Sequence, residues 1–180
     1  VVDTRGGDDE VTTNRMDIGF LRVITGAVND TVNVNDFNGI AAGVLLETGA
    51  GNDIINSNST TTSNFLQARG GDGDDTFFVA PFSYGNAIID GQEGSDTYTI
   101  MTADRSSRFI VARDSGVTGT DDLVIHGTNL DDVFTLQYGV ANVANQTVFY
   151  DPTTENMTLM TGAARDNVSV IGLSSPNSTM

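Results

Sequence analysis

The chain has 180 residues, 38% of them hydrophobic, and a formal net charge of −16 that comes from 20 Asp, 4 Glu and 8 Arg, without any Lys. This acidic balance argues against binding to nucleic acids or to anionic membranes, and favours cations as partners. There are no cysteines and no apolar run as long as a membrane span, so we expect neither disulfides, nor thiol sites, nor membrane insertion.

A turn motif rich in Gly and Asp recurs along the chain. In chain order the copies are "RGGDDEVTT" (5–13), "TGAVNDTVNV" (25–34), "TGAGNDIINS" (48–57), "GGDGDDTFFV" (70–79), "GQEGSDTYTI" (91–100), "TGTDDLVIH" (118–126), "GTNLDDVFTL" (127–136) and "TGAARDNVSV" (161–170). Aligned on their last acid, they are anchored at Asp9, Asp30, Asp53, Asp75, Asp96, Asp122, Asp132 and Asp166. The first four steps are 21, 23, 22 and 21 residues, a period that indicates a solenoid.

Each period contains two segments that alternate between apolar and polar residues. Positions two and four after an anchor are mostly apolar, as in Phe77 and Val79, and so are positions seven and nine before it, as in Ala68 and Leu66. Period-two alternation predicts strands with one buried face. We therefore predict an all-β fold, a parallel β-solenoid with coils of about 22 residues, in which each strand pairs with its equivalent one coil away. An antiparallel sandwich also alternates strands and turns, and it stays open as the alternative.

The regularity ends after residue 112. The next steps between anchors are 26, 10 and 34 residues, "RDSGV" (113–117) looks like an insertion, and "QTVFYD" (146–151) suggests an extra strand. We expect regular coils over residues 1–112 and an irregular continuation of the same solenoid over 113–180, with triangular, three-stranded coils. The single histidine, His126, is placed at an inward position, as a packed rather than a catalytic residue.

Stacked coils would place the anchoring aspartates in a column at one edge. Two carboxylates about 5 Å apart repel each other by about 3 kcal/mol at a dielectric constant near 20, so a column of them calls for neutralisation. Calcium binds carboxylate and backbone carbonyl oxygens, and glycine lets the turn fold tightly around it. The alternative for each aspartate is an Asx-turn, in which the side chain bonds its own backbone.

The segment "GGDGDDTFF" resembles the nonapeptide of hemolysin-type (RTX) calcium-binding repeats, G-G-x-G-x-D-x-U-x, and "TGAGNDIIN" and "GQEGSDTYT" keep most of it. The resemblance implies a parallel β-roll of secreted proteins, in which Ca²⁺ lies between stacked turns. RTX rolls carry the motif on both sides of each coil, whereas here one side carries it, so ions would line one edge. The residues that the resemblance implies as ligands are Asp53, Asp75 and Asp96, followed by Asp30, with Asp72 and Asp74 as outer ligands. Asp132 and Asp166 are further implied ligands, in copies of the motif where Leu130 and Ala164 replace glycine.

The sequence thus predicts a calcium-binding structural β-solenoid module of a secreted or cell-surface protein, such as a stalk, adhesin, surface-layer or filament element. Neither end shows a cap, so the predicted partners are calcium ions, flanking coils of the same polypeptide or head-to-tail copies, and cell-surface glycans. The alternative is a carbohydrate-active β-helix enzyme, a polysaccharide lyase or hydrolase. Its best candidate charges are Arg105, Arg108 and Arg113, which lie near Asp104 and Asp114.

Overall fold

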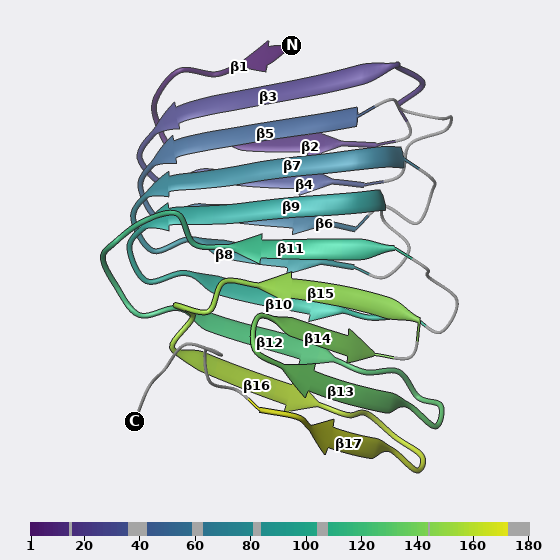
Figure 1. Ribbon diagram of the computed structural model, residues 1–180. Coiled ribbons are helices and arrows are strands. Elements are labelled where there is room, and N and C mark those ends of the chain that lie inside the picture. The colour runs from purple at the N-terminus through teal and green to yellow at the C-terminus, as the bar shows by residue number, and fades with distance from the viewer. Residues whose placement is uncertain are drawn as a thin grey trace.

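The computed structural model describes residues 1–14, 16–35, 43–58, 63–80, 84–103, 108–143 and 145–172. Over these ranges the secondary structure is entirely β, and the strands form two sheets that lie face to face along a common stack (Figure 1). None of the described segments forms a helix with the length and hydrophobicity needed to span a bilayer.

The two sheets differ in strand length and number. The first sheet contains, in spatial order, β1 (Val2–Asp3), β3 (Phe20–Ala27), β5 (Gly43–Ala50), β7 (Ser63–Asp72), β9 (Tyr84–Glu93), β11 (Phe109–Arg113), β15 (Gln146–Tyr150), β14 (Val140–Val143), β13 (Val133–Gln137) and β17 (Asn167–Val170). The second sheet contains β16 (Asn156–Met160), β12 (Asp122–His126), β10 (Thr97–Met101), β8 (Thr76–Val79), β6 (Ile54–Ser57), β4 (Thr31–Val34) and β2 (Glu10–Thr13).

The chain alternates between the sheets, one strand in each, up to β12. Every pair of neighbouring strands in this part is parallel, and the register matches equivalent positions one coil apart, as in Val23↔Leu46 and Phe77↔Tyr98. Each Gly/Asp turn carries the chain from a first-sheet strand to a second-sheet strand, and these turns line one edge of the stack (Figure 1). The predicted parallel β-solenoid is confirmed, and the antiparallel sandwich is excluded for this part of the chain.

The core consists of the inward residues of both sheets. Val23, Leu46, Ala68 and Ile89 on the first sheet are fully buried, because they alternate with outward polar neighbours along their strands. On the second sheet the rings of Phe77 and Tyr98 stack with centroids 5.2 Å apart. Burial of each large apolar side chain contributes on the order of 1.5–3 kcal/mol, so the stack is stabilised continuously along its length.

The irregular part departs from the predicted triangular coils. The expected extra strand exists as β15, but β13, β14 and β15 form antiparallel hairpins inside the first sheet rather than a third face. The tight turn at Tyr138 and Gly139 reverses the chain directly after β13, so β14 pairs antiparallel with β13. At the end of the sheet, Val168 and Val170 of β17 pair with the buried Phe134 and Leu136 but are themselves 45% and 57% exposed.

His126 is not inward, contrary to the prediction. Leu123 and Ile125 are the buried residues of β12, and His126 is partly exposed. The reason is that Asp121, not Asp122, occupies the corner position. Asp122 pairs with Thr97, the residue after the corner aspartate Asp96, so the equivalent of Asp96 is Asp121. The side chain of Asp121 is 2% exposed, whereas Asp122 lies at the surface.

Candidate functional site

The corner aspartates of successive coils form a row of hydrogen bonds along the edge that carries the Gly/Asp turns. We call Asp9, Asp30, Asp53, Asp75, Asp96 and Asp121 the inner row. In each step the backbone N–H of one aspartate donates to Oδ1 of the next, at 2.8, 2.7, 2.8, 2.8 and 2.9 Å in chain order. From Asp30 onward, each carboxyl group therefore links its own coil to the preceding one. This confirms the predicted stacking on one edge for Asp9, Asp30, Asp53, Asp75 and Asp96.

The second oxygen of most inner-row carboxyl groups is buried without a hydrogen-bond donor. Within the described residues this holds for Oδ2 of Asp9, Asp30, Asp53, Asp75 and Asp96. The side chains of Asp30, Asp53, Asp75 and Asp96 are at most 1% exposed. A buried polar atom without a partner is costly, so these oxygens mark the place where the corner needs either a proton or a cation.

Glycine provides the space for this packing. A Cβ atom at Gly70 would overlap Oδ2 of Asp75, and one at Gly91 would overlap Oδ2 of Asp96 and the hydroxyl of Tyr98. That hydroxyl accepts a hydrogen bond from the Gly91 N–H at 2.9 Å and donates to the Arg113 carbonyl at 2.7 Å. The motif glycines thus serve close packing inside the corner, as well as the shape of the turn.

A second row runs outside the first, in the opposite direction. This outer row consists of Asn29, Asn52, Asp74 and Ser95, the residues just before the corner aspartates. Here the backbone N–H of each later coil donates to the side chain of the earlier one, from Asn52 to Asn29 at 2.8 Å, from Asp74 to Asn52 at 3.0 Å and from Ser95 to Asp74 at 2.8 Å. The predicted outer ligand Asp74 is thus a member of this row, and Asp72 is an exposed residue beside it.

Burial and mutual repulsion alter the acidity of the inner row. The pKa of Asp75 is raised to about 8, mainly by burial and in part by the charges of Asp96, Asp53 and Asp74, against the effect of the Asp53 N–H. Burial raises the pKa of Asp96 to about 6, with further contributions from Asp114, Asp74 and Asp90. The pKa of Asp53 is also raised by burial.

Two acids that the sequence interpretation missed continue the inner row. Asp121 accepts the hydrogen bond from Asp96, and its own N–H donates to Oε2 of Glu155 at 2.8 Å. The pKa of Asp121 is raised to about 7, mainly by burial and in part by the neighbouring Asp114 carboxyl. The alternation rule contained the signal, because apolar residues stand both two and four places after Asp121 and after Glu155, whereas His126 stands four places after Asp122.

Asp132 and Asp166 lie at the opposite edge, contrary to the predicted single column. They follow second-sheet strands and precede β13 and β17 of the first sheet, so their turns belong to the other corner of the coil (Figure 1). There the Asp132 N–H donates to Oδ1 of Asp166 at 3.1 Å, and both oxygens of Asp132 have partners in the N–H and hydroxyl of Thr128. The same hydrogen-bond scheme thus serves a second, two-membered corner.

In the inner row, the oxygen of each carboxyl group that a cation could bind is the buried Oδ2. Oδ1 of Asp75 and of Asp96 accepts a backbone N–H, and Oδ2 packs against the backbone five residues earlier, at Gly70 and Gly91 respectively. Calcium needs six to eight oxygen ligands. In the part of the chain that the structure describes, no group of three or more acidic or histidine side chains is arranged to hold a metal ion. Calcium binding at the predicted aspartates stays a prediction.

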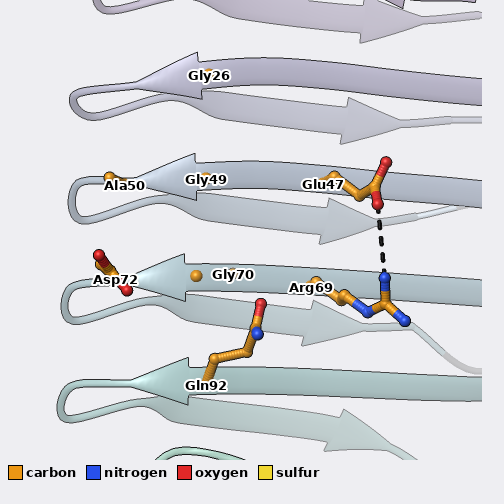
Figure 2. A pocket seen from close by; sticks show the side chains of 9 residues that line it. Gly26, Glu47, Gly49, Ala50, Arg69, Gly70, Asp72 and Gln92 are labelled. Atoms are coloured by element: carbon orange, nitrogen blue, oxygen red, sulfur yellow. Dashed lines mark hydrogen bonds and ion pairs between the residues drawn. The ribbon is translucent and has the colours of Figure 1, made fainter.

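A second feature is a hollow of about 500 Å³ on the outer face of the first sheet, next to the Gly/Asp turns. Its floor is a strip of residues with little or no side chain, among them Gly26, Gly49 and Gly71. Figure 2 shows Glu47 and Arg69 at one side, joined by an ion pair, Asp72 at the opposite side next to the turn, and Gln92 between them on the next strand. The hollow combines an acid, an arginine and an amide around exposed backbone, which suits a polar ligand.

Of the charges considered for an enzyme, Asp104 and Arg105 lie outside the described residues. Asp114 faces Asp121 at the end of the inner row. Comparisons with models of protein families, with curated proteins and with solved structures found no match to this chain.

Proposed function

We propose that this chain is a structural β-solenoid module of a secreted or cell-surface protein, acting as a stalk, adhesin segment, surface-layer or filament element. The observation that supports this most directly is the unbroken stack from β2 to β12, in which a continuous core and two hydrogen-bonded rows repeat with every coil. Such a stack holds a fixed shape along its axis because each coil contacts mainly its neighbours and is bonded to both of them. Rigidity and reach are the properties that a stalk or surface element requires.

Deletion of one whole coil tests the structural role. Removal of residues 54–75 joins Asp53 to Thr76, and this junction has the same local sequence as Asp75–Thr76. We expect a folded protein that is shorter by about 4.8 Å along the axis and still unfolds in a single transition. Small-angle scattering and circular dichroism measure both properties, and collapse of the deletion variant to an unfolded chain would contradict a modular stack.

Location is tested separately. Antibodies raised against the chain should label intact producing cells or recover the protein from the medium. Label that appears only after lysis would overturn the secreted or surface assignment while leaving the modular stack intact.

The hollow favours a second candidate function, recognition of a polar glycan, with or without its cleavage. The guanidinium of Arg69 and the carboxylate of Glu47 form the kind of polar, partly exposed pair that binds hydroxyl and carboxylate groups. Calorimetry with a panel of acidic and neutral oligosaccharides tests binding, and product analysis tests cleavage. Arg69→Ala should abolish a specific signal, whereas Arg22→Ala, which removes another partner of Glu47 outside the hollow, should not. Absence of any signal across the panel removes this candidate.

A further inference from the structure

The outward face of the first sheet carries exposed aromatic rings near the start of its strands. Phe20 on β3 is 57% exposed and Phe109 on β11 is 38% exposed, while Phe65 on β7 is half-buried between them. No strand of the described chain packs on this face (Figure 1). Large apolar side chains that are exposed together on one face indicate a surface that binds a partner.

The register of the sheet places these rings in one line along the stack. Phe20 pairs with Gly43 and Phe65 with Asn86, and the register of the adjoining positions sets Gly43 beside Phe65 and Asn86 beside Phe109. We call Phe20, Phe65 and Phe109 the aromatic row. Its rings recur at every second coil, about 10 Å apart for coils spaced by about 4.8 Å.

Along this row a ring alternates with a small or polar residue. The ring of Phe20 lies against Gly43, because a Cβ atom on that glycine would meet its Cδ2 and Cε2 atoms at 3.5 Å. Asn86 occupies the next gap, and its Oδ1 accepts the Phe109 N–H at 3.3 Å. The amide nitrogen of Asn86 has no acceptor in the described structure, so its two N–H groups can donate to a ligand.

The strip around the aromatic row is almost uncharged, on a chain whose net charge is −16. The adjoining line of outward residues from β5 to β11 consists of the partly exposed Leu45, Gln67, Ile88 and Val111. On β3 this line begins with Arg22, whose charge is paired with Glu47 at 2.6 Å. An acidic polymer is repelled by the molecule as a whole, whereas a neutral one meets an uncharged strip. Charge therefore favours an uncharged partner.

A partner that matches the whole row has to repeat along the axis of the stack. Aromatic rings bind sugars by stacking on the C–H face of a pyranose ring. In an extended β-1,4-linked glycan each sugar is turned over relative to the one before, so the same face recurs at every second sugar. That repeat is close to two coils of this stack. The helical, α-linked chains of starch do not present it, and a folded protein partner has no reason to follow the period of the coils.

We propose that the aromatic row is a binding platform for a neutral, extended β-1,4-linked glycan of glucose or N-acetylglucosamine, which lies along the axis with alternate sugars on the rings. Phe149, whose ring packs edge-on against Phe109 with centroids 6.1 Å apart, extends the platform by one coil. The platform rests on the proposed role as a surface element and adds a partner to it. It lies towards the opposite end of the strands from the hollow beside the Gly/Asp turns.

The test is co-sedimentation of the purified full chain with microcrystalline cellulose and with chitin, which separates the two sugars, while calorimetry with their soluble oligosaccharides measures the affinity. We expect binding to at least one of the two, and none to starch or to the acidic polymer polygalacturonate. Phe20→Ala and Phe109→Ala should each weaken binding by roughly twofold to tenfold, and the double variant by more. Phe109→Tyr keeps a ring and should bind as the native chain does.

Two control variants should keep the native affinity. Phe78→Ala removes a partly exposed ring from the outward face of the second sheet, and Arg69→Ala alters the hollow only, so it separates the platform from that site. Circular dichroism checks that each variant is folded, which we expect because Phe20 and Phe109 are more than a third exposed.

Three results would each overturn the platform: no binding to cellulose or chitin, equal binding to starch, or an unchanged affinity in the double alanine variant. A dimer of the native chain that Phe20→Ala dissociates would also overturn it, because the row would then be an interface between copies. None of these results depends on the coil deletion or on the labelling of cells, so the platform and the proposed structural role can fail separately.

Discussion

The backbone N–H of Asp53 donates a 2.8 Å hydrogen bond to Oδ1 of Asp75, one coil further along, while Oδ2 of Asp75 lies buried without a donor. This contact defines the corner of the solenoid. It joins two residues 22 positions apart in sequence, and because the aspartate recurs in every coil, the same bond joins each coil to the next. We call this bond the staple. Because the motif aspartate is occupied in this way, its recurrence has a structural cause that does not require a bound ion.

The staple is tested at Asp53, whose Oδ1 accepts the buried Asp30 N–H at 2.7 Å. Asp53→Ala and Asp53→Asn both remove the charge, but only the amide keeps an acceptor for this N–H. We expect the alanine variant to be less stable than the asparagine variant by about 1–3 kcal/mol, as for a buried donor left unpaired. Urea denaturation measures the difference, and the same pair of changes at the exposed Asp72 should differ by much less.

A second prediction concerns the close approach of backbones at Gly49. This residue has a φ of 109°, and a Cβ there would overlap the carbonyl oxygen of Gly26 in the preceding coil. Gly49→Ala should therefore lower the free energy of unfolding by about 3 kcal/mol or more, through backbone strain and displacement of a packed coil. Gly19→Ala is the matched control, since nothing lies within 4 Å of its added Cβ. Equal losses at both positions would contradict the close packing of the corner.

Val28 offers a stabilising change. It has a φ of 71° at the position where four later copies of the turn have glycine, and its side chain is 49% exposed. A β-branched residue is strained in this conformation by about 1–2 kcal/mol, of which the flexibility of glycine in the unfolded chain cancels part. Val28→Gly should raise the free energy of unfolding by about 0.5–1 kcal/mol. Val117→Gly, at a 91% exposed residue without a positive φ, should bring no gain.

Tyr98 tests the inner side of the corner. Its hydroxyl accepts the Gly91 N–H and donates to the Arg113 carbonyl, so Tyr98→Phe leaves two backbone groups without their partner. We expect a loss of about 1–3 kcal/mol with an unchanged ring stack on Phe77. Thermal melts measure the loss, and Tyr138→Phe at the surface should have little effect. Burial also raises the pKa of the Tyr98 phenol, so its ionisation should lag behind that of exposed tyrosines in an alkaline absorbance titration.

The regular coils were predictable because two signals agree there. Period-two alternation placed Leu46 and Val32 in the core, and the 21–23-residue spacing placed their equivalents one coil away, where the structure pairs them. A register error of one residue would have exposed every core side chain, so the sequence specifies this part strongly. The antiparallel β13–β15 insertion carries no such signal, because alternation describes a half-buried strand in either direction.

The candidate site was predicted in position but not in contacts. The carboxylate of a tight Gly/Asp turn can bind a cation between coils or accept an N–H from the neighbouring coil. The sequence does not distinguish the two, whereas the structure shows that the Asp53 N–H donates to Asp75. Asp132 and Asp166 were misplaced for a related reason. The motif specifies the local shape of a corner, and the solenoid has two corners, so the same residues occur on both edges once β13 enters the first sheet out of phase.

The alignment of the inner and outer rows with the axis of the stack has a mechanical consequence. Both rows, like the sheet hydrogen bonds, lie along the axis of the stack, so tension applied between its two ends stretches them one coil at a time. A sideways load is instead shared by all the coils that it crosses. A solenoid of this kind resists bending far better than it resists peeling, and a pull along its axis should unwind it in steps of one winding.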